Sequence, residues 1–205
     1  QAKRVENLEN LVDSYEDQLG TYLVKLSSRN LSTRDSHTLS TLLHCIGDFE
    51  RIGDHAANMI KSVEEIHNKG ITFSPEAHKE LAILTKALEE ILNLTTEAFE
   101  KDDVVIAKKV EPLEQAIDFI TSEIKSRHVT RLQNGECTIE TGFILSDLLN
   151  NYERVSDHCS NIAVAIIELD HRSFGTHAYL NSIKSNENKE FCADYEYYVE
   201  KYALG

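Results

Sequence analysis

Apolar residues recur along most of this chain at alternating steps of three and four, which is the spacing of one face of an α-helix. Glycine and proline, which interrupt helices, occur only 8 and 2 times in 205 residues. The sequence therefore predicts an all-α protein whose long amphipathic helices pack as a bundle. The expected helices cover residues 3–28, 33–69, 75–100, 103–133 and 139–171, and a tail that turns at Gly175 carries an aromatic helical face (Phe191, Tyr195, Tyr198 and Tyr202).

The charge balance restricts the classes of partner. The chain has 35 acidic and 21 basic side chains, which gives a formal net charge of −14. Such a surface repels the phosphates of nucleic acids and of anionic lipids, so we expect cations or basic surfaces as partners and no nucleic acid. No stretch approaches the roughly 20 apolar residues that span a bilayer. The four cysteines form no CxxC pair, which suits reduced thiols in a cytoplasmic protein.

Two stretches of the sequence repeat at an offset of just over one hundred residues. Residues 2–13 align with 107–118, where Glu9 matches Glu114 at an offset of 105, and residues 49–58 align with 152–161 at an offset of 103. The identities fall on charged positions, whereas a repeat maintained for packing would preserve the apolar positions. We therefore expect a first unit of two helices (1–70), a second unit of three helices (71–172) and a helical tail (173–205). The opening helix of the first unit is either missing from this chain or replaced by the C-terminal helix.

The repeated stretches contain four Glu-x-x-x-Asp pairs. Each acid directly follows a residue of the apolar face, so every pair borders the core at the same angle, and the pairs can meet two by two where helices adjoin. Buried unpaired carboxylates cost several kcal/mol each, so a cation must compensate them. An all-oxygen cage suits Mg²⁺, Mn²⁺, Ca²⁺ or iron, and bridging carboxylates allow more than one ion in a site. The candidate metal ligands are Glu9, Asp13, Glu50, Asp54, Glu114, Asp118, Glu153 and Asp157.

Other residues lie beside these acids. Two asparagines continue the acid stripe four residues beyond an aspartate, and each could add a carbonyl oxygen. Two histidines lie about 100° around the helix from the aspartates. We therefore expect them to donate hydrogen bonds to the carboxylates or to lie at the surface, and direct binding of a metal ion by either histidine is an alternative. These further candidates are Asn58, Asn161, His55 and His158. Arg51 and Arg154 are expected to orient carboxylates or contact a neighbouring helix, and Pro112 to kink the helix just before Glu114.

The sequence resembles the PhoU family of phosphate-transport regulators at residues 48–55 (Asp-Phe-Glu-Arg-Ile-Gly-Asp-His) and 151–158 (Asn-Tyr-Glu-Arg-Val-Ser-Asp-His). The resemblance covers about residues 2–171 and reaches all four acidic pairs. It implies a PhoU-like helical bundle of two repeated three-helix units, with multinuclear iron or other metals bound by the eight acids. Iron is the metal that the resemblance favours, and Mg, Mn, Zn or Ca are alternatives.

The missing first helix and the added tail are similar to the cytoplasmic C-terminal domain of bacterial sodium/phosphate cotransporter-type proteins. Because the chain opens at Gln1 within a helical pattern, we expect it to come from a longer reading frame. The resemblance implies a non-enzymatic metal-binding domain that regulates phosphate uptake at the inner face of the cell membrane. Its partner would be the membrane domain of the transporter, and a homodimer stays open. A stand-alone PhoU-type regulator is the alternative.

Other classes of protein compete with this interpretation. A ferritin-like di-metal enzyme needs two Glu-x-x-His motifs, and the matches are Glu64 with His67 and Glu168 with His171. These matches lie near helix ends, and their glutamates are 104 residues apart, so they do not superpose in the repeat. A hydrolase using His158 and Cys159 is disfavoured because adjacent helical residues diverge. A purely structural bundle with solvated acids and no metal remains an alternative.

Overall fold

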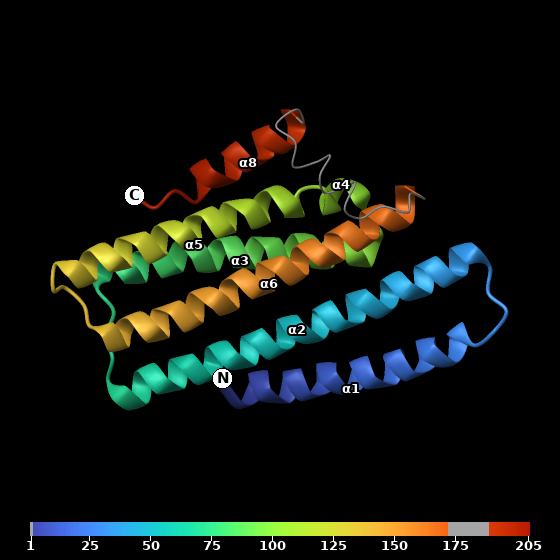
Figure 1. Ribbon diagram of the computed structural model, residues 1–205, viewed down its shortest axis with the longest axis horizontal. Helices are drawn as coiled ribbons and strands as arrows, with labels where there is room; N and C mark the ends of the chain where they lie inside the picture. Colours follow the sequence, from blue (N-terminus) through green and yellow to red (C-terminus); the bar gives the residue numbers. More distant parts are fainter. Residues whose placement is uncertain (1, 172–188) are drawn as a thin grey trace.

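The computed structural model describes residues 2–171 and 189–205, and all regular structure in this part is α-helical (Figure 1). The expected all-α class is therefore confirmed. The turn expected at Gly175 and the first part of the tail lie outside the described residues. The helices are α1 (Ala2–Ser27), α2 (Thr33–Lys69), α3 (Pro75–Lys101), α4 (Val104–Ala107), α5 (Val110–Gln133), α6 (Ile139–His171) and α8 (Lys189–Lys201).

Helices α2 and α3 begin and end where the sequence supplies caps. The Ser32 hydroxyl accepts a hydrogen bond from the backbone N–H of Asp35, and Ser74 caps α3 in the same way ahead of Pro75. Gly70 ends α2 in the left-handed conformation, with φ of 64°, and its N–H donates to the carbonyl of His67. The expected bounds of α2 and α3 are accordingly confirmed to within one residue.

The helix expected over residues 103–133 is interrupted and forms as α4 and α5. Pro112 has no N–H for the carbonyl of Lys108, and in a continuous helix its ring would clash with that carbonyl. The chain breaks at Lys108 and Lys109, and Pro112 lies in the first turn of α5, where its N–H is not needed. The expected kink is thus a full break, and Glu114 follows within the second turn of a new helix.

The helices form two groups that meet where α2 packs along α6 (Figure 1). In the first group, α1 lies along α2. In the second group, α3, α5 and α6 pack against one another and enclose the main core, in which the largest side chains with under 2% exposure include Leu84, Leu113, Ile117 and Leu145. Among the described residues, no helix combines the length and the apolar character needed to cross a membrane. All four cysteines are free, and burial raises the pKa of Cys45 to about 11.

Helix α8 packs on the outside of the second group, far from α1 in the view of Figure 1. Tyr198 and Tyr202 are buried in the core cluster beside α5, and Lys201 pairs with Glu90 of α3 at 2.7 Å. The alternative in which the C-terminal helix replaces the opening helix of the first unit is therefore wrong. The apolar face of α8 packs against α5 instead.

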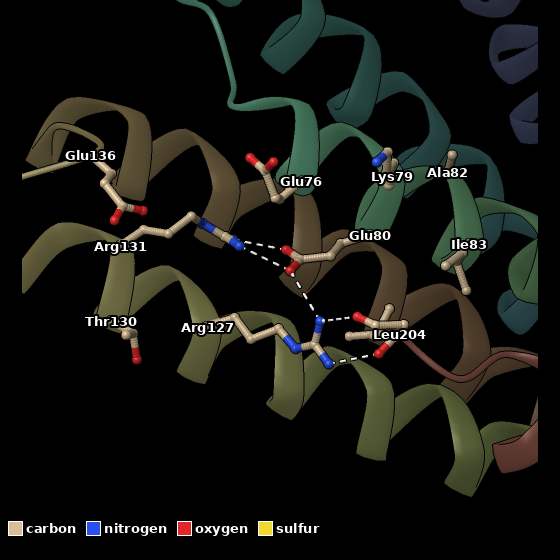
Figure 2. A pocket seen from close by; sticks show the side chains of 11 residues that line it. Glu76, Lys79, Glu80, Ala82, Ile83, Arg127, Thr130, Arg131, Glu136 and Leu204 are labelled. Carbon is tan, nitrogen blue, oxygen red and sulfur yellow. Dashed lines mark hydrogen bonds and ion pairs between the residues drawn. The ribbon is translucent and has the colours of Figure 1, made fainter. Parts of the chain in front are cut away.

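Two residues after α8, Leu204 and Gly205, line a hollow of about 810 Å³ together with residues of α3 and α5 (Figure 2). Arg127 donates hydrogen bonds to the carbonyl oxygens of Leu204 and Gly205 at 2.7 and 3.1 Å. Beside it, Arg131 makes two hydrogen bonds of 2.8 and 2.9 Å to the buried carboxylate of Glu80. This ion pair joins α3 to α5, and Arg127 ties the end of the chain to the same junction.

Helix α1 is much less covered than its counterpart in the repeat. Leu23 is its single buried residue, and both Leu8 and Leu11 are 50% exposed. Their counterparts at the offset of 105, Leu113 and Ala116 in α5, are fully buried. The difference follows from packing, because α5 is enclosed by α3, α6 and α8, whereas α1 packs chiefly on α2.

Candidate metal centre

Three acids from the first pair of helices converge on one point, which we term the first carboxylate site. Glu9 and Asp13 of α1 and Asp54 of α2 each offer an oxygen, and the three oxygens lie within 4.8 Å of one another. Residues four apart share a helix face, which explains why both acids of α1 point at α2. At Gly53, an added Cβ would meet the side chain of Val12 at 3.8 Å, so α1 and α2 approach closely beside the site.

The first carboxylate site is only partly compensated by positive charge. Oδ1 of Asp13 is buried and accepts no hydrogen bond from the described residues. Burial and the neighbouring charge of Asp54 raise the pKa of Glu50, with Asp13 adding to the shift and Arg51 opposing it. A partly buried carboxylate oxygen without a donor, surrounded by other carboxylates, is an environment that a bound cation stabilises.

The second carboxylate site repeats this arrangement between α5 and α6. Glu114, Asp118 and Asp157 bring oxygens within 4.8 Å of one another, and Glu114 is only 8% exposed. These residues are the repeat counterparts of Glu9, Asp13 and Asp54. Within the described part of the chain, these two groups are the ones in which three or more His, Cys, Asp or Glu residues come this close. The repeat in sequence is therefore a repeat in space.

The fourth acids of the motifs lie beside the two groups rather than within them. Glu153 lines a hollow of about 430 Å³ together with Asp118 and Asp157. It is paired with Lys125 of α5, whose Nζ lies 2.8 Å from Oε2 of Glu153. In the first site, Arg51 lies 3.5 Å from Glu50 through Nε and 3.7 Å from Asp54 through Nη1.

The arginines that follow the glutamates contact carboxylates of their own motifs, as expected. Arg154 lies 3.2 Å from Asp157, in the same relation as Arg51 to Asp54. Both guanidinium side chains are largely exposed, at 62% for Arg51 and 66% for Arg154. They therefore contact the outer carboxylates and leave the buried Oδ1 of Asp13 without a hydrogen-bond donor among the described residues.

The two candidate histidines lie between α2 and α6 and outside both carboxylate groups. Nδ1 of His158 is 2.8 Å from Oδ1 of Asp48, and Nδ1 of His55 is 2.9 Å from Oδ1 of Asn151. The two imidazole rings stack with their centroids 5.7 Å apart. Because each histidine directly follows an aspartate of a carboxylate site, these contacts join the two sites across the interface of the units.

The two candidate asparagines also have other partners. Asn161 donates a hydrogen bond to Asp48 at 3.1 Å, and Asn58 accepts one from Lys61 at 3.0 Å. Neither belongs to a carboxylate group. Three residues of the Glu-x-x-His matches of the ferritin-like alternative, Glu64, His67 and Glu168, do not belong to one either.

Sequence reasoning missed two residues in the surroundings of the second site. Lys125 follows Asp118 by seven residues, which is two helical turns on the same face, and this spacing was the available signal. Glu111 precedes Glu114 by one turn, is 5% exposed and accepts a short hydrogen bond from Ser160 of α6. Its counterpart in the first unit, Glu6, is exposed, so the buried glutamate is particular to the second site.

The donor set is chemically uniform. Each group offers three carboxylate oxygens from two helices, with neither a thiolate nor an imidazole among them. Hard cations such as Mg²⁺, Mn²⁺, Ca²⁺ and iron favour oxygen ligands of this kind. The residues present therefore fit a bound metal ion at each site.

Comparison with known proteins gives a consistent result. The family model described as the PhoU domain matches residues 1–63 and 81–166. The phosphate-specific transport system accessory protein PhoU homolog 1 of Thermotoga maritima is 23% identical over 170 residues, which cover 82% of this chain and 72% of that protein. The PhoU homolog of Pseudomonas aeruginosa is 21% identical over 193 residues, covering 92% of this chain and 79% of that protein. The crystal structure of PhoU from Pseudomonas aeruginosa superposes with a TM-score of 0.77 over 84% of this chain and 82% of that chain, at 21% identity, which shows a shared fold.

Proposed function

The chain belongs to the PhoU family, and from this premise we propose that it is a regulator of phosphate transport that binds metal ions at its two carboxylate sites. The relatives named above are accessory proteins of a phosphate-specific transport system, so the chain is a regulator rather than an enzyme. The observation that carries the proposal of metal binding is the convergence of matching acids, three in each repeat, within 4.8 Å.

The comparisons favour a separate accessory protein over a domain that continues a sodium/phosphate cotransporter, because the named relatives are accessory proteins. In both forms the partner that we propose is the membrane transporter, contacted from the cytoplasmic face. The reading frame upstream of Gln1 separates the two forms. Apolar membrane spans directly before Gln1 would establish the attached form.

The carboxylates give the regulator a means of responding to cations. Three acids from adjacent helices repel one another when no cation is present, and this repulsion weakens the packing of α1 on α2 and of α5 on α6. A metal ion supplies positive charge shared by both helices of a site. The acids of α1 and α2 then hold these helices together, and metal occupancy determines how firmly α1 is attached. Iron is the metal that the family resemblance favours, and the oxygen donors also suit Mn²⁺, Mg²⁺ or Ca²⁺.

Elemental analysis tests this proposal on protein purified without chelator and without affinity histidines. One variant neutralises the first site (Glu9→Gln, Asp13→Asn and Asp54→Asn), and another neutralises the second (Glu114→Gln, Asp118→Asn and Asp157→Asn). We expect each to lose the metal of its own site, while a control with Glu196→Gln and Glu200→Gln retains the native content. Those control acids are also four apart but lie exposed on α8. Native protein that holds no more metal than the site variants would contradict metal binding.

A further inference from the structure

The two carboxylate sites differ in one residue that faces the fourth acid. In the second site, Nζ of Lys125 lies 2.8 Å from Oε2 of Glu153 and 3.5 Å from Oδ1 of Asn150. The offset of 105 that relates α5 to α1 places Gly20 at the matching position of the first site. Helix α1 therefore presents no side chain where α5 presents an ammonium group.

The lysine is positioned to act on the metal-binding acids. It lies on the same face of α5 as Asp118, two turns further along. Its partner Glu153 lines the hollow that Asp118 and Asp157 also line. The side chains of Lys125 and Glu153 are 40% and 30% exposed, so solvent screens this pair less than a pair on an open surface.

The fourth acid of the first site has a different environment. Arg51, on the same helix as Glu50, lies 3.5 Å from it, and the side chain of Arg51 is 62% exposed. Arg51 also lies 3.7 Å from Asp54, so Glu50 shares this cation with an acid of the first carboxylate site. Among the described residues, the ion pair of Glu50 therefore comes from its own helix, whereas Glu153 is paired with Lys125 of a neighbouring helix.

We propose that Lys125 takes the place of a metal ion in the second carboxylate site, so that this site holds one ion fewer than the first. This inference rests on the proposed metal-binding function. The ammonium gives Glu153 the positive charge that a further ion would provide, and it repels a cation that approaches the same carboxylate. Three acids then remain for metal in the second site, whereas Glu50, which lies beside the three acids of the first site, stays available there as a fourth.

The number of bound Mn²⁺ ions tests whether Lys125 takes the place of a metal ion. All proteins in this experiment carry the three neutralising substitutions in the first site, so that only the second site can bind Mn²⁺. Isothermal titration calorimetry and electron paramagnetic resonance then count the ions bound there. Lys125→Gln is expected to raise the bound Mn²⁺ from one ion per chain to two. Lys69→Gln is the matched control, because it removes the same charge from a 2.8 Å pair with Glu65 at the far end of α2. An unchanged count in the Lys125→Gln protein overturns the inference.

The converse substitution tests the first site. Gly20→Lys is made in the chain whose second site is neutralised, with Gly20→Ala as its control. A Cβ at position 20 meets only Oε1 of Glu16, at 3.9 Å, so either side chain fits without displacing the backbone. We expect the lysine to lower the count in the first site by one ion and the alanine to leave it unchanged. Equal counts in both variants would refute the exchange of lysine for metal.

The results also separate this inference from the proposed function. If the native chain binds no Mn²⁺ at either site, the proposed metal-binding function fails and the inference fails with it. If both sites bind equal numbers of ions and Lys125→Gln changes neither, the proposed function stands and only the role of the lysine is rejected. Circular dichroism of every variant confirms that the helices are retained.

Discussion

Buried acids in this protein are compensated in two different ways. Glu80 is 4% exposed, and Arg131 satisfies both of its oxygens (Figure 2). Bidentate pairing of this kind provides charge and geometry together, and removal of one partner typically costs about 3–5 kcal/mol. Asp13, by contrast, has a buried oxygen without a hydrogen-bond donor among the described residues. The contrast distinguishes an acid that stabilises the fold from an acid that the proposed metal site leaves available for a ligand.

A single buried histidine is expected to make stability depend on pH. Burial, followed by the charge of Arg131, lowers the pKa of His128 below its usual value of 6.5, with Glu80 opposing. The fold therefore favours the neutral imidazole, and the stability it contributes is present above pH 6.5 and is lost as pH falls through the lowered pKa. We expect the urea midpoint to fall on acidification below pH 6.5.

The substitution His128→Gln is expected to reduce this dependence, measured from urea titrations at several pH values. His44→Gln, at an exposed position of α2, is the control and should leave the dependence as in the native chain. Equal slopes in native protein and in His128→Gln would rule out His128 as the source.

At the scale of helices, α1 stands apart from the other long elements. It has one buried residue and packs chiefly on α2, whereas α5 has twelve buried residues and is enclosed by α3, α6 and α8. Local opening requires less free energy where fewer apolar contacts are lost. The first carboxylate site spans α1 and α2, so a cation bound there adds to the attachment of α1.

Hydrogen exchange should therefore be fastest in α1 among the long helices, and Mn²⁺ should slow it. Mass spectrometry of exchange with and without Mn²⁺ measures both effects. The variant neutralised in the first site should lose the protection by Mn²⁺, and the variant neutralised in the second site should keep it. Exchange in α1 as slow as in α5, or unaffected by Mn²⁺ in native protein, would contradict this account.

The sequence predicted features that depend on residues close together in the chain better than features that depend on contacts between distant helices. Local signals sufficed for α2 and α3, because Ser32, Gly70 and Ser74 cap these helices within a few residues. Pro112 was expected to bend a helix and instead separates two. The pairing of Lys125 with Glu153 depends on the axial register of α5 against α6, which no local pattern specifies. The acids could be predicted to converge because the same pattern occurs on both helices of each unit.

At the scale of the molecule, the acids of the four Glu-x-x-x-Asp motifs account for much of the charge. Eight of the 35 acidic side chains belong to the four motifs, so neutralising them would change the formal net charge from −14 to −6. The sites lie in separate units, and self-repulsion destabilises a compact acidic chain. Cation binding should therefore stabilise the molecule as a whole.

We expect Mn²⁺ to raise the free energy of unfolding through both sites. At a free concentration 100 times the Kd, each independently occupied ion contributes about 2.7 kcal/mol. Urea unfolding in Mn²⁺ and in a chelator measures the increase, and each site variant should show only the part due to the remaining site. An increase that persists when both sites are neutralised would assign the stabilisation to other residues.

The contacts of His55 and His158 reveal the symmetry of the interface between the units. Position 55 contacts position 151, and position 158, its counterpart, contacts position 48, which is the counterpart of 151. This reciprocity is the property of an isologous interface, in which two identical subunits face each other across a two-fold axis. The present chain has the geometry of a symmetric dimer fused into one polypeptide. Fusion allows each half to change independently. Two pairs of counterparts in the repeat illustrate this: Asn151 corresponds to Asp48, and Lys125 corresponds to Gly20.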